Sequence, residues 1–193
     1  MKKKNDELLL DLADENDGYV SVAESRENGI AQTYLSLAVE AGLFLKVSKG
    51  LYRRRHVEPD PFYELSFRYK KAVFDFHSAL YLHGLSDDCV LEVALPLNYL
   101  TKGVPGVKSR HLGNKEFSLG QSYVVSPKGN LISSFDLERT MIDLLRNEAE
   151  FDRETFIFIW KKALEKAPYP EKLQAYAEAF HEDKTLRMMT KLF

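Results

Sequence analysis

A chain of 193 residues with a formal net charge of −2 has room for one medium domain or two small ones, each with its own core. Apolar residues make up 45% and charged residues 29% of the sequence, a balance that excludes a disordered or fibrous protein. No apolar run approaches the roughly 20 residues that cross a bilayer, and Asp6 and Glu7 stand where a signal peptide would be apolar, so we expect a cytoplasmic protein.

Positive charge is concentrated in two stretches of the chain. Between Ile30 and His56 the only anion is Glu40, and between positions 102 and 128 the only anion is Glu116. Local basic surfaces on a chain that is acidic overall favour specific nucleic-acid binding over indiscriminate coating. The first stretch carries Lys46, Lys49, Arg53, Arg54 and Arg55, and the second carries Lys102, Lys108, Arg110, Lys115 and Lys128.

The N-terminal third begins with two predicted helices. Residues 3–16 place apolar side chains at helical spacing among Lys, Asp and Glu, which predicts an amphipathic helix. Ser21 can cap a second, short helix over Val22–Glu27, and Glu24 three residues later completes a capping box. Asn28-Gly29 then predicts a turn.

A third helix and a hairpin follow this turn. The helix is predicted over Ile30–Ala41, with Gly42 at its C-terminal cap. The segment Leu43–Arg54 alternates apolar and polar residues on either side of Ser48-Lys49-Gly50, which predicts a β-hairpin. The side chains expected on the buried face of the helix are Ile30, Tyr34, Leu37, Ala38 and Ala41.

Helix, short helix, turn, helix and basic hairpin is the order of a winged helix-turn-helix, whose second paired helix enters the DNA major groove. The opposite face of the third helix would present Gln32, Thr33 and Ser36 to base edges or phosphates. Lys46, Lys49 and the arginines Arg53, Arg54 and Arg55 would then contact the DNA backbone. The alternative is that these residues are only the solvated faces of an ordinary helix and strand.

The prolines of His56–Pro61 predict an extended linker that separates residues 1–56 from residues 62–193. Beyond it the patterns predict a helix over Ala72–His83, strands near Val90–Leu95 and Ser122–Val125, a loop over Gly103–Gly106 and a brief strand at Leu131 and Ile132. Helices are expected over about 136–147, from Asp152 to Lys166, and as one or two more toward the C-terminus. The fold class is therefore α+β, with a mixed α+β domain and C-terminal helices after the winged helix.

Three stretches of this sequence resemble the AbiEi antitoxins of AbiE-type toxin-antitoxin systems. The first runs from Gly18-Tyr19-Val20-Ser21 through Gly29-Ile30, Leu35 and Ala41-Gly42-Leu43 to Lys49-Gly50-Leu51-Tyr52. The second is His77–Leu85 with Ala94-Leu95-Pro96, and the third is Glu138-Arg139-Thr140 with Met141–Leu145. Together they span about residues 20–145, and no motif of this kind covers the C-terminal tail.

The resemblance implies an N-terminal domain that represses its own operon by binding inverted repeats in the operator DNA. It also implies a C-terminal domain that counters a nucleotidyltransferase-like toxin in a type IV system, without a stable complex. The runner-up is a winged-helix regulator whose second domain mediates only assembly or ligand sensing. A nuclease with a DNA-binding appendage is a third alternative, which the lack of a lysine two residues after Glu92 disfavours.

The second basic stretch is either a mixed solvated loop region or a second nucleic-acid-facing surface, formed by Lys102, Lys108, Arg110, Lys115 and Lys128. His77 and His83 stand six positions apart, off the spacing with which two helical histidines hold one metal. The adjacent His77 and Ser78 point about 100° apart on a helix and cannot form a nucleophile and base, so we expect either side chain to cap a helix. Arg139 and Asp143 are predicted to form a structural ion pair. Cys89 is expected to be a small buried thiol. We expect no enzyme activity, catalytic residue, cofactor or metal.

Overall fold

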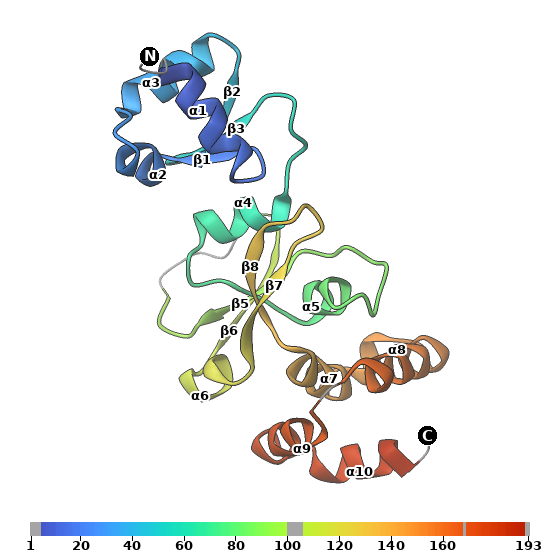
Figure 1. Cartoon of the computed structure of the whole chain (residues 1–193). Coiled ribbons are helices and arrows are strands. Elements are labelled where there is room, and N and C mark those ends of the chain that lie inside the picture. Colours follow the sequence, from blue (N-terminus) through green and yellow to red (C-terminus); the bar gives the residue numbers. More distant parts are fainter. Residues whose placement is uncertain (1–4, 100–105, 168, 192–193) are drawn as a thin grey trace. The chain divides into compact units, whose positions relative to one another are not determined.

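The computed structural model describes residues 5–99, 106–167 and 169–191 and has a mixed α+β fold, as expected (Figure 1). The chain divides into two compact units. Unit 1 comprises residues 1–70 and 125–132, and unit 2 comprises residues 71–124 and 133–193. Unit 1 therefore continues past the linker that the sequence predicts over 56–61, and it includes a hairpin end from much later in the chain.

Unit 1 has three helices and a small antiparallel sheet before the position of the predicted linker. The strands are ordered β1-β3-β2, so the first strand pairs with the last. The predicted helices and hairpin are present, although the third helix begins at Gln32 instead of Ile30. The elements are α1 (Asn5–Asp14), β1 (Tyr19–Ser21), α2 (Val22–Glu27), α3 (Gln32–Glu40), β2 (Phe44–Ser48) and β3 (Leu51–Arg54).

The core of this part of unit 1 forms between α1, α3 and the sheet. Leu9 and Ala13 of α1 are fully buried and pack in one cluster with Leu35 of α3 and Phe44 of β2. The apolar face that the spacing predicts for α1 is therefore the buried one. Burying a leucine or phenylalanine side chain contributes about 1.5–3 kcal/mol, so this cluster holds the two helices against the sheet.

The segment predicted to be an extended linker, residues 56–61, leads directly into a helix. Asp60 is fully buried, and its Oδ1 accepts hydrogen bonds from the backbone N–H groups of Phe62 and Tyr63, both at 3.1 Å. This caps α4 (Pro61–Arg68), whose Pro61 occupies a position where no N–H is needed. Asp60, which stands between two prolines, therefore caps a helix. The same Pro-Asp-Pro pattern is compatible with a capped helix start and with an extended linker.

Unit 2 contains a five-stranded mixed sheet with the strand order β6-β5-β4-β8-β7. Strand β4 is antiparallel to β5 and parallel to β8, and β5 is parallel to β6. Two of these strands differ from expectation: β4 occupies residues predicted to be helical, and β6 lies in the second basic stretch. The strands are β4 (Val73–Phe74), β5 (Glu92–Pro96), β6 (Lys108–Leu112), β7 (Gln121–Val125) and β8 (Leu131–Phe135).

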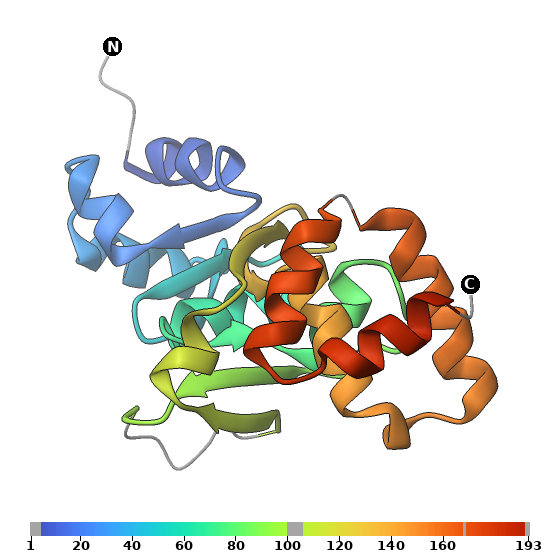
Figure 2. The ribbon, with the colours of Figure 1, turned by 90° about the horizontal axis from the view of Figure 1, so that it is seen from below.

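The helices of unit 2 bury their apolar faces in one large cluster. Leu80 of α5, Leu144 of α7 and Trp160 of α8 are fully buried in it. Leu173 and Leu186 bring in the last two helices, which contact each other and meet at an angle (Figure 2). The helices are α5 (Phe76–Leu82), α6 (Asn114–Ser118), α7 (Leu137–Arg146), the short 3₁₀ helix η1 (Glu148–Glu150), α8 (Arg153–Lys166), α9 (Pro170–Ala179) and α10 (Asp183–Lys191).

The end of the β7–β8 hairpin belongs to unit 1. Asn130 Nδ2 donates a hydrogen bond to Asp60 Oδ2 at 2.8 Å, and the Ser126 hydroxyl donates to the same oxygen. All three side chains are buried. Over the described residues, no helix is long and apolar enough to cross a membrane.

Candidate nucleic-acid interface

Side-chain hydrogen bonds at both ends of α2 fix this helix and the turn that leads to α3. The predicted capping box is present, because Ser21 Oγ accepts from Glu24 N at 3.1 Å and Glu24 Oε2 accepts from Ser21 N at 2.7 Å. At the other end of α2, the buried Ser25 hydroxyl donates to Ile30 O at 2.9 Å. Gly29 has a φ of +72°, which glycine adopts without strain. These contacts set the direction in which α3 begins.

Helix α3 presents a different face from the one predicted. Leu35 and Ala38 are buried, whereas Tyr34 is 38% exposed and Leu37 is 54% exposed. Ala41 is exposed as well, so the expectation that Tyr34, Leu37 and Ala41 are buried is wrong. The apolar residues of α3 are compatible with either of two faces of the helix being buried, that is, with two phases of the helix. Packing against α1 and the sheet selects the phase that buries Leu35. The exposed stripe at i, i+3, i+4 and i+7 is Thr33, Ser36, Leu37 and Glu40.

The polar residues predicted for recognition are nevertheless exposed at the start of α3. Gln32, Thr33 and Ser36 all lie on the surface, and Gln32 Oε1 accepts a hydrogen bond from Arg26 Nη2 at 3.3 Å. Ala31 at the N-cap offers no side-chain hydrogen bond. Tyr34 N donates to Ala31 O at 2.9 Å, so the N–H groups of Gln32 and Thr33 are the ones left to solvent or to a ligand. The N-terminus of a helix attracts anions.

The β2–β3 hairpin carries two exposed lysines, Lys46 and Lys49. The strands are antiparallel, with a register shift between Lys46 and Ser48 that marks a β-bulge. A bulge bends the strand and redirects its side chains. The turn that follows uses Gly50 at φ +87°. Lys49 thus lies in a defined turn at the hairpin end, whereas Lys46 lies on β2 opposite Tyr52.

The two arginines of β3, which are predicted to contact DNA, have anionic partners within unit 1. Arg53 Nε lies 3.3 Å from Glu64 Oε1, its side chain is only 13% exposed, and it also donates to Val57 O. Arg54 pairs with Asp14. Arg55 is exposed and donates through Nε to Gly42 O at 2.8 Å. The strand pattern shows cations, but only the tertiary fold shows that two of them already have anionic partners.

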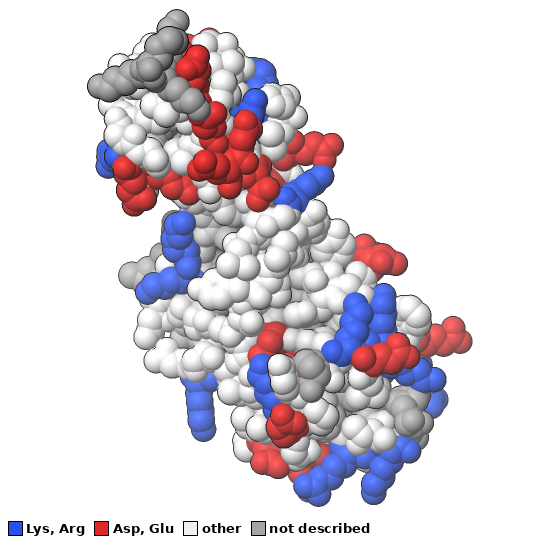
Figure 3. Space-filling view, viewed as in Figure 1, with Lys and Arg blue, Asp and Glu red and all other residues white. Residues whose placement is uncertain are grey.

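The exposed surface of α1 is acidic. Asp6, Glu7, Asp11 and Asp14 are all exposed, and Figure 3 shows the acidic side chains gathered over this face of unit 1. Negative charge repels the phosphate backbone of DNA. A nucleic-acid interface on unit 1 must therefore use α3 and the hairpin instead of α1.

The residues of the second basic stretch are divided between the two units. Lys102 lies outside the described residues, and Lys128 belongs to unit 1, where it pairs with Glu58. Lys108 of β6 and Lys115 of α6 are exposed on unit 2. Arg110 is engaged inside unit 2, so Lys108 and Lys115 are the exposed cations of the predicted surface among the residues of that unit that the structure describes.

Arg110 joins two buried carboxylates. Its Nη2 donates to Asp75 Oδ1 at 2.8 Å and lies 3.2 Å from Asp143 Oδ1, and its Nε donates to Asp75 Oδ2. Burial raises the pKa of Asp75, against the opposing hydrogen bonds from Arg110. Although burial opposes its charge, the two carboxylates raise the pKa of the Arg110 guanidinium. The arrangement ties β6 to α5 and α7.

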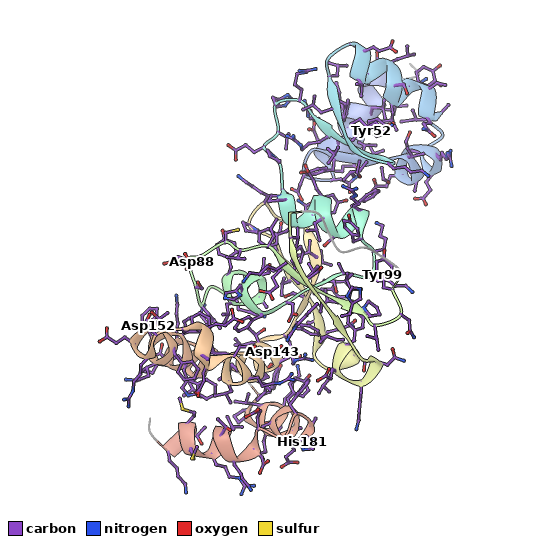
Figure 4. The ribbon with its side chains drawn as sticks, turned by 180° about the vertical axis from the view of Figure 1, so that it is seen from behind. Tyr52, Asp88, Tyr99, Asp143, Asp152 and His181 are labelled. Carbon is purple, nitrogen blue, oxygen red and sulfur yellow. The ribbon has the colours of Figure 1, made fainter. Side chains whose placement is uncertain are left out.

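Arg139 is fully buried beside this pair. Its Nε donates to Asp143 Oδ2 at 2.9 Å, so the predicted ion pair is present on α7, where Figure 4 labels Asp143. The guanidinium carbon lies 4.3 Å from the ring centres of both Phe135 and Phe180. The third stretch of the resemblance is therefore a packing element of unit 2.

His77 contacts a strand residue and the Ser78 hydroxyl donates to Val90 O at 2.8 Å, so neither side chain is seen to cap a helix, contrary to expectation. His77 Nδ1 lies 2.8 Å from Glu92 Oε2, and His83 Nε2 lies 2.8 Å from Phe135 O. Since a carbonyl oxygen only accepts, His83 carries a proton on Nε2. Cys89 is exposed, not buried as predicted. Among the described residues no group of three or more His, Cys, Asp or Glu side chains is placed to hold a metal ion.

A search of protein-family models finds no match to this chain, and a search of curated proteins finds none either.

Proposed function

We propose that the chain is a DNA-binding transcriptional regulator whose unit 1 is a winged helix-turn-helix. In this proposal α2 and α3 form the helix-turn-helix, α3 enters the major groove, and the β2–β3 hairpin is the wing. The observation that carries the proposal is the exposed start of α3, where Thr33 and Ser36 lie on a helix that packs against the lysine-bearing hairpin.

The chemistry of these residues fits the two kinds of contact that DNA needs. Hydroxyl and amide side chains such as Thr33 and Gln32 bond base edges, and the exposed Leu37 can contact a thymine methyl group. Lys46 and Lys49, together with Arg55, would lie along phosphates. Arg53 and Arg54 are left out of this interface because they are paired within unit 1.

The resemblance to AbiEi antitoxins extends the proposal to an autorepressor that also counters a nucleotidyltransferase-like toxin in the cytoplasm. Its second and third stretches supply buried core residues such as Leu80 and Leu144, so they bear on the fold of unit 2 and not on a toxin-binding surface. Growth of cells that express the neighbouring gene with and without this chain tests the antitoxin part. No protection by the folded full-length protein would overturn that part and leave a regulator.

The DNA-binding part is tested with fluorescence anisotropy on the duplex upstream of the protein's own gene and on a random duplex of equal length. We expect tighter binding to the upstream duplex. Thr33→Ala should change the preference between operator variants by about 1–3 kcal/mol, since one base contact is removed. Ser118→Ala on α6 is the matched control. Equal binding of wild type to both duplexes would reject specific recognition by α3.

A further inference from the structure

A cavity of about 450 Å³ lies between the end of the β2–β3 hairpin and the C-terminal turn of α4, within unit 1. We call it the turn pocket. Its volume is within the range of roughly 300–1,000 Å³ that ligand sites occupy. The described residues that line it are Val47, Ser48, Lys49, Phe67 and Arg68.

The turn pocket is basic. Lys49 and Arg68 are both exposed and come from different elements, and among the described lining residues none is acidic. Lys70 adds a third cation close by, with its Nζ 3.9 Å from the centre of the Phe67 ring. Cations that converge without carboxylates attract an anion.

The Ser48 hydroxyl supplies a second, independent indication of a ligand. Its oxygen is buried and has no hydrogen-bond partner among the described residues. A buried hydroxyl without a partner is costly, and native structures leave few of them. The β-bulge between Lys46 and Ser48 redirects this part of the strand, and such bulges are frequent next to binding sites.

A purely structural role explains only part of this arrangement. Arg68 in the last turn of α4, and Lys70 two residues beyond the helix, complement the negative end of the helix dipole. Lys49 and Ser48 belong to the hairpin, so the dipole of α4 gives no reason for either of them. An anion held between the hairpin and α4 would explain the positions of all four residues, Ser48, Lys49, Arg68 and Lys70.

We propose that the turn pocket binds a phosphodiester group of DNA, with Arg68 and Lys49 as its cationic contacts and Ser48 as a neutral donor. Val47 and Phe67 form an apolar wall suited to the adjoining deoxyribose. The inference rests on the proposed function, and it extends the interface from α3 and the hairpin to α4. Arg68 and Ser48 thereby become backbone-positioning residues, which set the register of the protein on the duplex.

The test measures binding of the upstream duplex by anisotropy between 50 and 200 mM salt, for wild type, Arg68→Ala and Ser48→Ala. Losing one phosphate contact removes about 0.9 from the slope of log affinity against log salt, so the advantage of wild type over Arg68→Ala should shrink by about 3.5-fold across this range. Ser48→Ala should bind about three- to tenfold more weakly at every salt concentration, because a neutral hydrogen bond is lost.

Thermal denaturation separates a binding role from a structural one. Ser48→Ala removes a hydroxyl that has no partner, so it should leave the melting temperature unchanged or raise it while it weakens DNA binding. Arg187→Ala on α10 and Ser118→Ala on α6 are the matched controls and should bind DNA like wild type. A second arm adds inorganic phosphate without DNA, at matched ionic strength, and no stabilisation is expected.

The duplex-binding and phosphate experiments together distinguish the two proposals. If wild type binds the duplex and both pocket variants bind equally well with the same slope, the turn pocket is not a DNA contact and the proposed function stands. If wild type binds no duplex, both proposals are overturned. Stabilisation by inorganic phosphate that Arg68→Ala abolishes would assign the pocket to a free phosphate ligand and overturn the DNA assignment.

Discussion

Asn130 Nδ2 donates a hydrogen bond to the buried carboxylate of Asp60 at 2.8 Å, although the two residues stand 70 positions apart. Asp60 also caps α4, and its backbone N–H donates to the Tyr19 hydroxyl at 2.8 Å. One aspartate therefore joins β1, α4 and the end of the β7–β8 hairpin within unit 1. A fragment that begins at residue 62 would leave Asn130 without this partner.

Asp60→Ala should lower the free energy of unfolding by about 3 kcal/mol, since a lost N-cap costs about 1 kcal/mol and stranded buried polar groups cost about 1–3 kcal/mol each. Asn130→Ala keeps the cap and should cost less, about 1–2 kcal/mol. Urea unfolding followed by circular dichroism measures both, with the exposed Glu58→Ala as the control. Equal stability of Asp60→Ala and Glu58→Ala would show that the network does not stabilise unit 1.

The phase of α3 is tested by two leucine variants two positions apart. Leu35→Ala should cost about 2–5 kcal/mol because it opens a cavity in the core of unit 1. Leu37→Ala should change stability by no more than about 0.5 kcal/mol, because its side chain is exposed, and should weaken binding to the upstream duplex. Chemical denaturation and anisotropy distinguish them. If Leu37→Ala destabilised the protein more than Leu35→Ala, the face of α3 predicted from the sequence would be the buried one.

The hairpin cations should separate into two groups. Lys46→Ala and Lys49→Ala should each reduce the salt slope of DNA binding by about 0.9 with little change in stability. Arg53→Ala should leave the slope unchanged but cost about 2 kcal/mol of stability, because it strands the half-buried Glu64. Salt-dependent anisotropy and thermal denaturation of the three variants make the comparison. A reduced slope in folded Arg53→Ala would place that arginine on the DNA.

Arg110 should behave as a structural residue and not as part of a basic surface. Arg110→Ala removes the cationic partner of the buried Asp75 and one of the cations beside Asp143, and should cost about 3 kcal/mol. Arg110→Lys should restore only part of this loss, because an ammonium group cannot make both hydrogen bonds to Asp75. Lys108→Ala and Lys115→Ala are the exposed controls, with changes within about 0.5 kcal/mol. A stable Arg110→Ala protein would contradict this assignment.

The stability of unit 2 should depend on His83 in mildly acidic solution. Burial lowers the pKa of His83, an effect opposed by its hydrogen bond to Phe135 O and by Asp136 and Glu138 and reinforced by Lys166. The unfolded chain, with an ordinary histidine pKa of about 6.5, then binds more protons than the folded one. The stabilising contribution is therefore complete above about pH 6.5 and is lost as the pH falls toward the lower, folded value.

His83→Gln cannot titrate in this range, so it should lose less stability than wild type between about pH 7.5 and pH 5. Denaturant unfolding at several pH values measures the difference, and His181→Gln, which alters an exposed histidine, serves as the control. Parallel curves for wild type and His83→Gln would show that His83 does not contribute to the acid sensitivity.

Local signals in the sequence predict much of unit 1 correctly. The capping box of Ser21 and Glu24, the turn at Gly29 and the alternation around Gly50 each involve residues within a few positions of one another. Such contacts depend on backbone geometry that the neighbouring residues set by themselves. The same holds for Asp152, which caps α8 as expected.

Short or polar elements are not predicted by local sequence signals. Strand β4 has two residues, too few to show a period, and its hydrogen bonds come from β5 and β8. Strand β6 has little apolar content, and its pairing with β5 is what makes it a strand. The structure of such segments is imposed by distant neighbours.

Tertiary packing decides which charged and apolar side chains remain available to a ligand. The sequence shows Arg53, Arg54 and Arg110 as cations, but Glu64, Asp14 and Asp75 are brought to them only by folding. The phase of α3 was settled in the same way, because Leu35 and Leu37 are equally apolar and only contact with α1 and the sheet distinguishes them. A linear pattern records what a side chain is, whereas its availability to a ligand depends on partners that are far away in the chain.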